Sequence, residues 1–275
     1  MRISKEEVLG KLHQLPSMPV VIQEIIASFN NENLDSNALA EMIARDQGLS
    51  AKVLRVANSP FYGLPRKIAS IKDAVMVMGF NAVRSLVLSA GIVNAFPTRP
   101  DGVFDRQAYW KHCFRVAGYA RALEQSLQLE PEMAFTAAMF HEIGQLVLDT
   151  CIPDEYSQVL QQQKSSGLAL AVIEQREFGF DHAEIGAEMS KRWNFPSEIE
   201  HAIRHWAKPD HAPFKPLNGL VYAAVLLESG LRGEDFIKQL PQDLCNRLEL
   251  SWVRIENGLP DTDALDAGAA QLLAS

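Results

Sequence analysis

Apolar residues recur every three or four positions along almost the whole chain, and runs in which apolar and polar residues alternate are scarce. A spacing of three to four keeps apolar side chains on one face of an α-helix, whereas a half-buried strand needs strict alternation. The Asn-Gly and Asp-Gly turns that close β-hairpins hardly appear in strand-like contexts either. The pattern therefore predicts an all-α protein folded as a multi-helix bundle.

Residues that cap helices mark where several of these helices begin. Ser70 is followed three residues later by Asp73, and Asp181 by Glu184, so both pairs resemble a capping box. The stretch 58–65, "NSPFYGLP", contains an asparagine, two prolines and a glycine and therefore predicts a loop. Caps and first-turn prolines predict further helix starts at Ser17 with Pro19, Asp35, Ser50, Pro131, Pro153 and Pro196.

Two breaks divide the predicted helices. Gly79 separates the helical segments on either side of it, and residues 97–105, "PTRPDGVFD", cluster Pro, Gly and Asp between two helical segments. We therefore expect short helices in an N-terminal subdomain, residues 1–98, and longer helices in a bundle, residues 99–255. Residues 256–275 are weakly amphipathic, which predicts a tail that forms a loosely docked terminal helix.

The composition fits a globular protein with a packed core. The chain has 275 residues, of which 47% are apolar, and a formal net charge of −8. A negative net charge argues against a nucleic-acid binder that relies on phosphate neutralisation. The longest apolar run, residues 86–96, is too short and too often interrupted to span a bilayer, and no secretory signal is recognisable. We therefore expect a cytoplasmic protein with no nucleic-acid or membrane partner.

Charge is distributed unevenly along the chain. The first 97 residues hold 10 basic and 8 acidic side chains, and the remainder holds 16 and 26. From Arg45 to Lys72 there are six basic residues and one acidic residue, Asp46. We interpret this basic cluster as a solvated helix face, and the alternative interpretation is a binding patch for an acidic partner.

Histidines supply the candidate chemistry of the predicted bundle. Residues 137–149, "AAMFHEIGQLVLD", place His141 and Glu142 side by side in a segment that otherwise reads as buried helix. Alanine and glycine residues share the helical face of His141, so another helix can approach it closely. His112 lies on a similar face of the preceding helix, and we expect the two imidazoles to face each other in one bundle core.

Three further histidines fall on later helices. His182 lies in a first helical turn, where the helix dipole disfavours the imidazolium and helps to keep the ring in its neutral, metal-binding form. His201 and His205 are four residues apart, a spacing that also occurs in zinc sites. For each histidine taken alone, a hydrogen-bonded core residue is the alternative interpretation, and only convergence on one cavity would indicate a site.

Longer motifs show a family resemblance over roughly residues 10–230. The segments "LPSMPVVIQEIIASF", "RDQGLSAKVLRVANSPFYG" and "IASIKDAVMVMGFNAVRSLVL" resemble the front half of the HDOD family, bacterial output domains related to the HD metal-dependent phosphohydrolases. The back half is similar to that family in "YWKHC", "MFHEIGQLVL", "FGFDHAEIGAEMSKRWNFP" and "EHAIRHWAKP". The resemblance implies an HD-related helical bundle preceded by a subdomain of short helices.

The resemblance also implies a metal site, but several of its positions differ. His112 and His141 match the HD ligands, whereas Glu142 stands in place of the expected aspartate. The terminal aspartate falls on Ala224, so that ligand is absent. In the histidine-pair segment Trp206 and Ala207 occupy the expected positions, and His205 is displaced by one residue, which turns a helical side chain by about 100°. The resemblance therefore implies at most a reduced site for a divalent metal (Mn, Fe, Zn or Mg), made of His112, His141, Glu142 and His182, with His205 in doubt.

These changes favour a non-catalytic signalling module that acts through protein partners, as the family resemblance implies. The partner would be another signalling protein, one of a cyclic-dinucleotide pathway being a candidate. The predicted interaction surface comprises the front helices and the loop residues Asn58, Ser59, Pro60, Phe61, Tyr62 and Gly63. The adjacent aromatics Phe61 and Tyr62 suit an exposed anchor, a plug over the old cavity, or a pin that holds the loop to its own core.

Two alternative functions remain open. One is a metal-dependent phosphohydrolase that retains a His/His/Glu site, in which metal-bound water attacks a phosphate. The other is a small-molecule sensor that uses the degenerate HD cavity without turnover. The sequence gives neither a further cofactor nor the oligomeric state.

Overall fold

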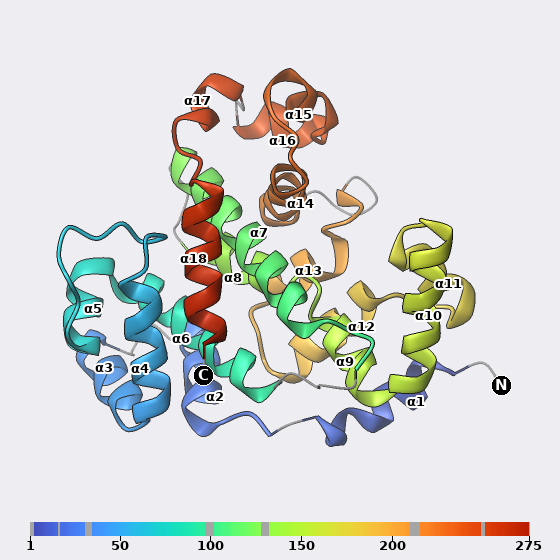
Figure 1. The fold of residues 1–275 in the computed structure, drawn as a ribbon, viewed down its shortest axis with the longest axis horizontal. Helices are drawn as coiled ribbons and strands as arrows, with labels where there is room; N and C mark the ends of the chain where they lie inside the picture. Colours follow the sequence, from blue (N-terminus) through green and yellow to red (C-terminus); the bar gives the residue numbers. More distant parts are fainter. Residues whose placement is uncertain are drawn as a thin grey trace.

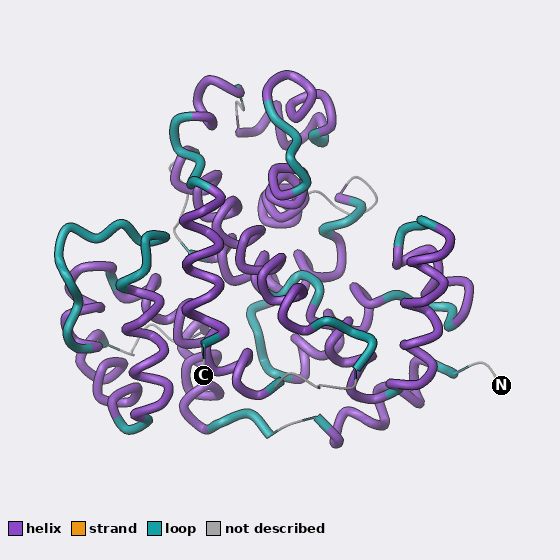
Figure 2. The backbone as a smooth tube through the Cα atoms, in the orientation of Figure 1, coloured by secondary structure: helices purple, strands orange, loops and turns teal. Residues whose placement is uncertain are grey.

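The computed structural model describes residues 3–15, 17–30, 35–96, 102–127, 132–209, 215–248 and 251–274. Within these ranges the regular secondary structure is helical throughout (Figures 1 and 2), which confirms the all-α prediction. In chain order the helices are α1 (Lys5–Gly10), α2 (Val20–Ala27), α3 (Ser36–Ala44), α4 (Gln47–Ala57), α5 (Ile71–Met78), α6 (Phe80–Ala95), α7 (Arg106–Ser126), α8 (Met133–Met139), α9 (Ile143–Cys151), α10 (Pro153–Ser166), α11 (Leu170–Glu177), α12 (His182–Arg192), α13 (Ser197–His205), α14 (Pro216–Glu228), α15 (Gly233–Gln239), α16 (Gln242–Leu248), α17 (Trp252–Glu256) and α18 (Thr262–Leu273), with short 3-10 turns at Lys11–Gln14 and Ser28–Asn30.

Helices α2 to α6 form the N-terminal group, at the left of Figure 1, and pack largely around α6. Ser70 caps α5 by accepting the backbone N–H of Asp73, and Gly79, with φ of 88°, separates α5 from α6 as predicted. The prediction that Ser50 opens its helix is wrong. Helix α4 begins four residues earlier, at Gln47, because the Asp46 carboxylate caps it by accepting the Leu49 N–H at 2.9 Å, whereas the Ser50 hydroxyl bonds the Ile43 carbonyl.

The second group is built around α7, which packs against α8, α14 and α18. Asp181 caps α12 and Pro153 starts α10, both as predicted, whereas Pro131 lies outside the described residues. The expectation that His141 and Glu142 lie within one continuous buried helix is wrong. Helix α8 ends at Met139 and α9 begins at Ile143, so the pair occupies the turn between them. The His141 ring stabilises this turn by bonding the Ala138 carbonyl at the end of α8.

Helix α18 is docked more closely than the expected loose tail. It runs along α7 and also packs against α4 (Figure 1), and it buries Leu265, Gly268, Ala269 and Leu272. Asp266 forms two short contacts with the Arg115 guanidinium on α7, at 2.6 and 2.7 Å. The sequence pattern gave little sign of this burial because Gly268 and Ala269, which add little to an apolar face, lie beside Leu265 and Leu272. The division of the chain at residues 98 and 255 stays a prediction.

No helix in the described ranges is both long enough and apolar enough to cross a lipid bilayer.

Candidate functional site

Three side chains converge between α7 and the α8–α9 turn. His112 comes from α7, and His141 and Glu142 come from the turn, and one donor atom of each lies within 4.8 Å of the others. The imidazole centroids of His112 and His141 are 5.6 Å apart. The expected meeting of these two rings therefore occurs, with the neighbouring carboxylate beside them.

His141 is held as a neutral ring with one nitrogen free. Its side chain is fully buried, and Nδ1 lies 2.6 Å from the Ala138 carbonyl oxygen. A carbonyl oxygen only accepts hydrogen bonds, so the proton is assigned to Nδ1 and Nε2 keeps its lone pair. Nε2 has no hydrogen-bond partner among the described residues. Burial lowers the pKa of His141 to about 4, which keeps the ring uncharged at neutral pH.

His112 lies between two carboxylates. Its Nε2 is 3.7 Å from Glu142 Oε2, and its Nδ1 is 3.2 Å from Glu228 Oε2 on α14. Burial by itself would lower the pKa of His112, but the hydrogen bond that His112 donates to Glu228 and the charges of both carboxylates raise it above its ordinary value. Glu228 was missed in the sequence. It lies four residues after the buried Ala224, one helical turn along α14, and that spacing was the available signal.

His182 is positioned by a carboxylate that the sequence did not reveal. Glu174 on α11 is fully buried, and its Oε2 lies 2.6 Å from His182 Nδ1 and accepts the His182 backbone N–H at 2.9 Å. Burial disfavours the imidazolium, but the adjacent Glu174 charge outweighs it and raises the pKa of His182 to about 9. The expectation of a ring kept neutral by the helix dipole is therefore wrong, since a contact at 2.6 Å outweighs a terminal partial charge.

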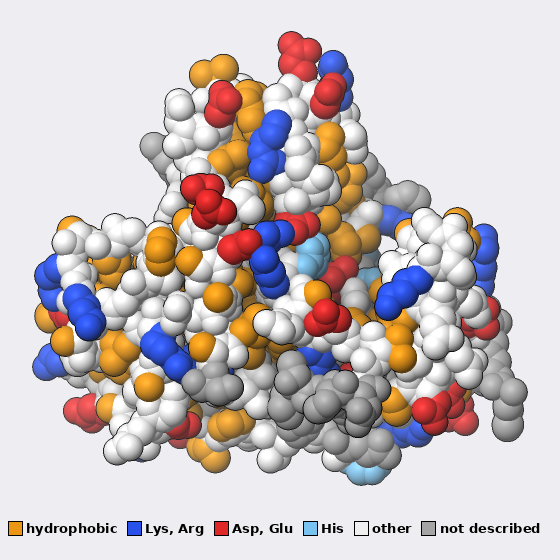
Figure 3. All heavy atoms as spheres, in the orientation of Figure 1, with side chains coloured by type: hydrophobic (Ala, Val, Ile, Leu, Met, Phe, Trp, Pro, Cys, Tyr) orange, Lys and Arg blue, Asp and Glu red, His pale blue; other side chains and the backbone are white. Residues whose placement is uncertain are grey.

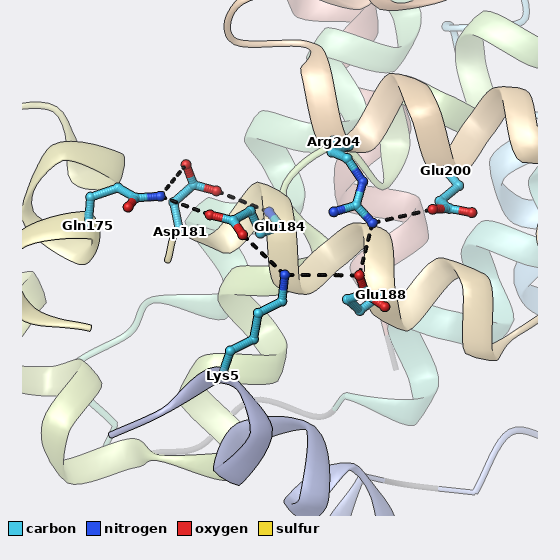
Figure 4. Close-up of polar contacts among 7 residues, drawn as sticks. All are labelled: Lys5, Gln175, Asp181, Glu184, Glu188, Glu200 and Arg204. Carbon is cyan, nitrogen blue, oxygen red and sulfur yellow. Dashed lines mark hydrogen bonds and ion pairs between the residues drawn. The ribbon is translucent and has the colours of Figure 1, made fainter. Parts of the chain in front are cut away.

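The close approach of α9 and α12 brings His182 near the turn. A Cβ atom at Gly144 would lie 1.9 Å from the His182 carbonyl oxygen, so only glycine fits there. The outer side of α12 is fixed by ion pairs, as Figure 4 shows. Lys5 Nζ of α1 lies 3.1 Å from Glu184 Oε2, and Arg204 Nη2 of α13 lies 3.1 Å from Glu188 Oε1.

A cavity of about 800 Å³ opens beside the cluster, lined in part by α7, α10, α11, α12 and the end of α13. His112, Glu142, His182 and His205 all line it. Figure 3 shows the corresponding hollow, with histidine side chains visible inside it. His205 therefore borders the same cavity as the other candidates despite its one-residue displacement, although it lies outside the three-residue cluster, and its ring centroid is 4.6 Å from that of His201.

Trp206 packs against His141, while His112 and Glu142 line the cavity directly. The Trp206 ring meets that of His141 edge to face, with centroids 4.8 Å apart and planes at 80°. His141 does not line the cavity, whereas Trp206 does. The indole therefore covers the ring that carries the free nitrogen.

The cluster fits a divalent cation only as a three-donor site. Two imidazoles and one carboxylate are suitable ligands, and the buried, unpartnered Nε2 of His141 is available to bind a metal. Ala224 supplies no fourth ligand, and Glu228 is engaged by His112. His112, His141 and Glu142 are thus the residues that would hold a metal, which would polarise a bound water or phosphate.

The predicted interaction loop lies apart from this cavity. Phe61 packs against Phe114 and Phe135 of α7 and α8, with ring centroids 5.0 and 6.3 Å apart, and the Arg121 guanidinium lies over Tyr62. Of the three roles considered for the aromatic pair, this packing matches the pin that holds the loop to its own core. Asn58, Pro60 and Gly63 remain exposed, and Ser59 is buried.

An all-α bundle with a His-His-Glu cluster at the α8–α9 turn defines an HD-related domain. The HDOD domain model matches residues 15–209, and the chain therefore belongs to the HDOD domain family.

Solved structures with the same fold come from several bacteria. A Shewanella amazonensis protein, provisionally assigned as a phosphohydrolase, is 27% identical with a TM-score of 0.81, and the match covers 98% of both chains. A Geobacter sulfurreducens HDOD protein of unknown function is 27% identical with a TM-score of 0.71, over 94% of this chain and 88% of that one. A Marinobacter aquaeolei protein, provisionally assigned to signal transduction, is 26% identical with a TM-score of 0.74, over 94% and 60%.

Among curated proteins, an uncharacterised Treponema pallidum protein is 24% identical over 254 residues, which is 91% of this chain and 48% of that protein. An uncharacterised Bacillus subtilis protein is 32% identical over 72 residues, which is 26% of this chain and 18% of that protein. The chain thus spans about half the length of the first relative and a smaller part of the second.

Proposed function

We propose that this HDOD domain is a non-catalytic regulatory module that acts through protein partners. The observation that carries the proposal is the edge-to-face contact of Trp206 with His141. A hydrolytic metal centre needs open coordination positions for water and substrate beside its ligands. In this chain an indole ring occupies the space next to the His141 imidazole, at a position where the family resemblance implies a histidine.

Two further features support the loss of catalysis. Ala224, at the position of the terminal aspartate, is fully buried and has no donor atom. His112 Nδ1 lies 3.2 Å from the Glu228 carboxylate, which helps to raise the pKa of His112, so a metal would have to compete with a proton for this imidazole.

Partner recognition is proposed for the N-terminal group of helices and the exposed part of the 58–63 loop. Packing of Phe61 and Tyr62 against α7 and α8 gives this loop a fixed shape, which lowers the entropic cost of binding. The expected partner is a signalling protein, one of a cyclic-dinucleotide pathway being a candidate. The similarity to a protein provisionally assigned to signal transduction supports this class of partner.

Hydrolysis assays test the non-catalytic proposal. Purified wild-type protein and a His141→Ala variant are incubated with nucleotides and cyclic dinucleotides in the presence of Mn²⁺, Fe²⁺, Zn²⁺ or Mg²⁺. We expect no turnover above that of the variant, which serves as the control for contaminating phosphatases. Turnover that His141→Ala abolishes would overturn the proposal.

A metal-dependent phosphohydrolase with a reduced site is the second candidate. It is favoured by the buried Nε2 of His141, which has no partner in the described part of the chain, next to two further donors. Metal analysis of protein purified without chelators separates the candidates. Stoichiometric Mn, Fe, Zn or Mg that disappears in His141→Ala would support the phosphohydrolase, and substoichiometric metal in both proteins would exclude it.

A further inference from the structure

The cavity beside the histidine cluster has a largely apolar wall. Aromatic and aliphatic side chains from four separate segments line it, namely Phe104, Tyr109, Leu160, Leu170 and Trp206. Its volume of about 800 Å³ falls within the range of sites that bind small organic molecules. Apolar walls of this kind bind flat or hydrophobic bodies, because such bodies leave water when they enter.

Basic side chains at this cavity are less compensated than acidic ones. Lys164 on α10 and Lys208 beyond α13 are exposed, and neither forms an ion pair within the described ranges. Asp105, Glu142 and Asp181 also line the cavity. Asp105 and Asp181 each cap a helix and accept backbone N–H groups from it, and Glu142 Oε2 lies 3.7 Å from His112 Nε2. The positive ends of α7 and α12 thus offset the Asp105 and Asp181 carboxylates, while the charges of the two lysines face solvent and the cavity.

Two hydrogen-bonding atoms without partners lie behind the cavity wall. Nε1 of Trp206 is a buried donor and Nε2 of His141, which the Trp206 ring covers, is a buried acceptor. Neither atom has a hydrogen-bond partner among the described residues. Leaving both atoms buried without partners is costly, and neither is exposed to a ligand in the cavity unless Trp206 moves.

We propose that this cavity binds a small organic anion with an aromatic body, whose carboxylate or phosphate group faces Lys164 and Lys208, and retains it without turnover. Bound ligand is then the input of the regulatory module, so the inference rests on the non-catalytic function proposed above. Trp206, which belongs to the wall and also touches His141, connects ligand binding to the old metal cluster.

Fluorescence titration with anilinonaphthalene sulfonate, an aromatic anion, tests the site. N-phenylnaphthylamine has a similar aromatic body without the charge and is titrated in parallel. We expect saturable binding of the anion to one site per chain. The double variant Lys164→Ala/Lys208→Ala should weaken it about two- to fivefold per lysine, without changing the uncharged probe. Lys191→Ala, an exposed lysine outside the cavity, is the charge control and should bind like wild type.

A blocking variant tests whether the probe occupies this cavity. Ala108 is exposed on α7 and lines the cavity, so Ala108→Trp fills the space without disturbing the core. It should weaken binding at least tenfold while the melting temperature stays unchanged. Ala38→Trp on α3, also at an exposed alanine, is the matched control. Equal binding of the sulfonate by Ala108→Trp and by wild type would overturn the site. If the double lysine variant lost affinity equally for the charged and the uncharged probe, the preference for anions would be overturned.

Displacement by naphthoate and by naphthyl phosphate distinguishes the two anionic groups. Displacement by either, without release of fluorescent naphthol from the phosphate, supports the inference. Failure of both to displace the sulfonate would overturn it and leave the non-catalytic function untouched. Release of naphthol that depends on His141 would instead overturn the proposed function, while binding itself would stand.

Discussion

The buried pair of Glu174 and His182 makes stability depend on pH in a defined window. The pKa of His182 is about 9 in the folded protein, against 6.5 for the unperturbed residue. A difference of about 2.5 pH units, at about 1.36 kcal/mol each, corresponds to roughly 3 kcal/mol. Because the folded-state pKa is the higher one, this contribution is fully present below pH 6.5 and is lost as the pH rises through 9.

Replacement of Glu174 by glutamine removes the charge and keeps the shape of the side chain. Only the weaker charges of Glu142 and Asp181 then oppose the burial of His182, so its pKa should fall to about 6.5 or lower and the protein should lose about 3 kcal/mol of stability at pH 6. Urea unfolding at pH 6 and pH 9 measures the stability, and an NMR titration of the His182 ring reports the pKa directly. Glu177→Gln, an exposed position on the same helix, is the control. A His182 pKa near 6.5 in the wild type, or one that Glu174→Gln leaves unchanged, would refute the reasoning.

Three further predictions concern buried contacts. Gly144→Ala should destabilise the protein by about 1–3 kcal/mol or more in urea unfolding, since its Cβ would lie 1.9 Å from the His182 carbonyl oxygen. Gly10→Ala, whose Cβ would meet nothing within 4 Å, is the control and should be neutral or stabilising. Leu265→Ala in α18 should cost about 2–5 kcal/mol because the side chain is fully buried, and a loss below about 0.5 kcal/mol would mean that α18 is loosely docked after all. Arg106→Met should cost about 3–5 kcal/mol by leaving the Asp149 carboxylate buried without its charge partner, and an unchanged melting temperature would contradict this.

Local sequence signals predicted the elements well where the cause is itself local. The Ser70 and Asp181 caps and the break at Gly79 depend on residues within one turn of each other, and all three occur as expected. The α4 start was misplaced because Asp46 and Ser50 are both good caps, and only the hydrogen bond to the Leu49 N–H decides between them. The turn at His141 interrupts an apolar periodicity that by itself reads as one helix.

The site was predictable only in part, because its partners come from distant segments. His112, His141 and Glu142 were found from their places on predicted helix faces and then through the family resemblance, and they do converge. Glu174 was missed because nothing in its local sequence distinguishes a buried carboxylate from an exposed one, and Glu228 was missed because its spacing from Ala224 was the only signal for it. Their roles follow from the packing of α11 against α12 and of α14 against α7, which sequence periodicity does not specify.

The central claim is that the HD-type cluster of this protein no longer performs hydrolysis. The rate of phosphate release from nucleotide and cyclic-dinucleotide substrates in the presence of Mn²⁺, compared between wild type and His141→Ala, tests it most directly. The account predicts equal background rates for the two proteins. A wild-type rate well above background that falls to background in His141→Ala would contradict it.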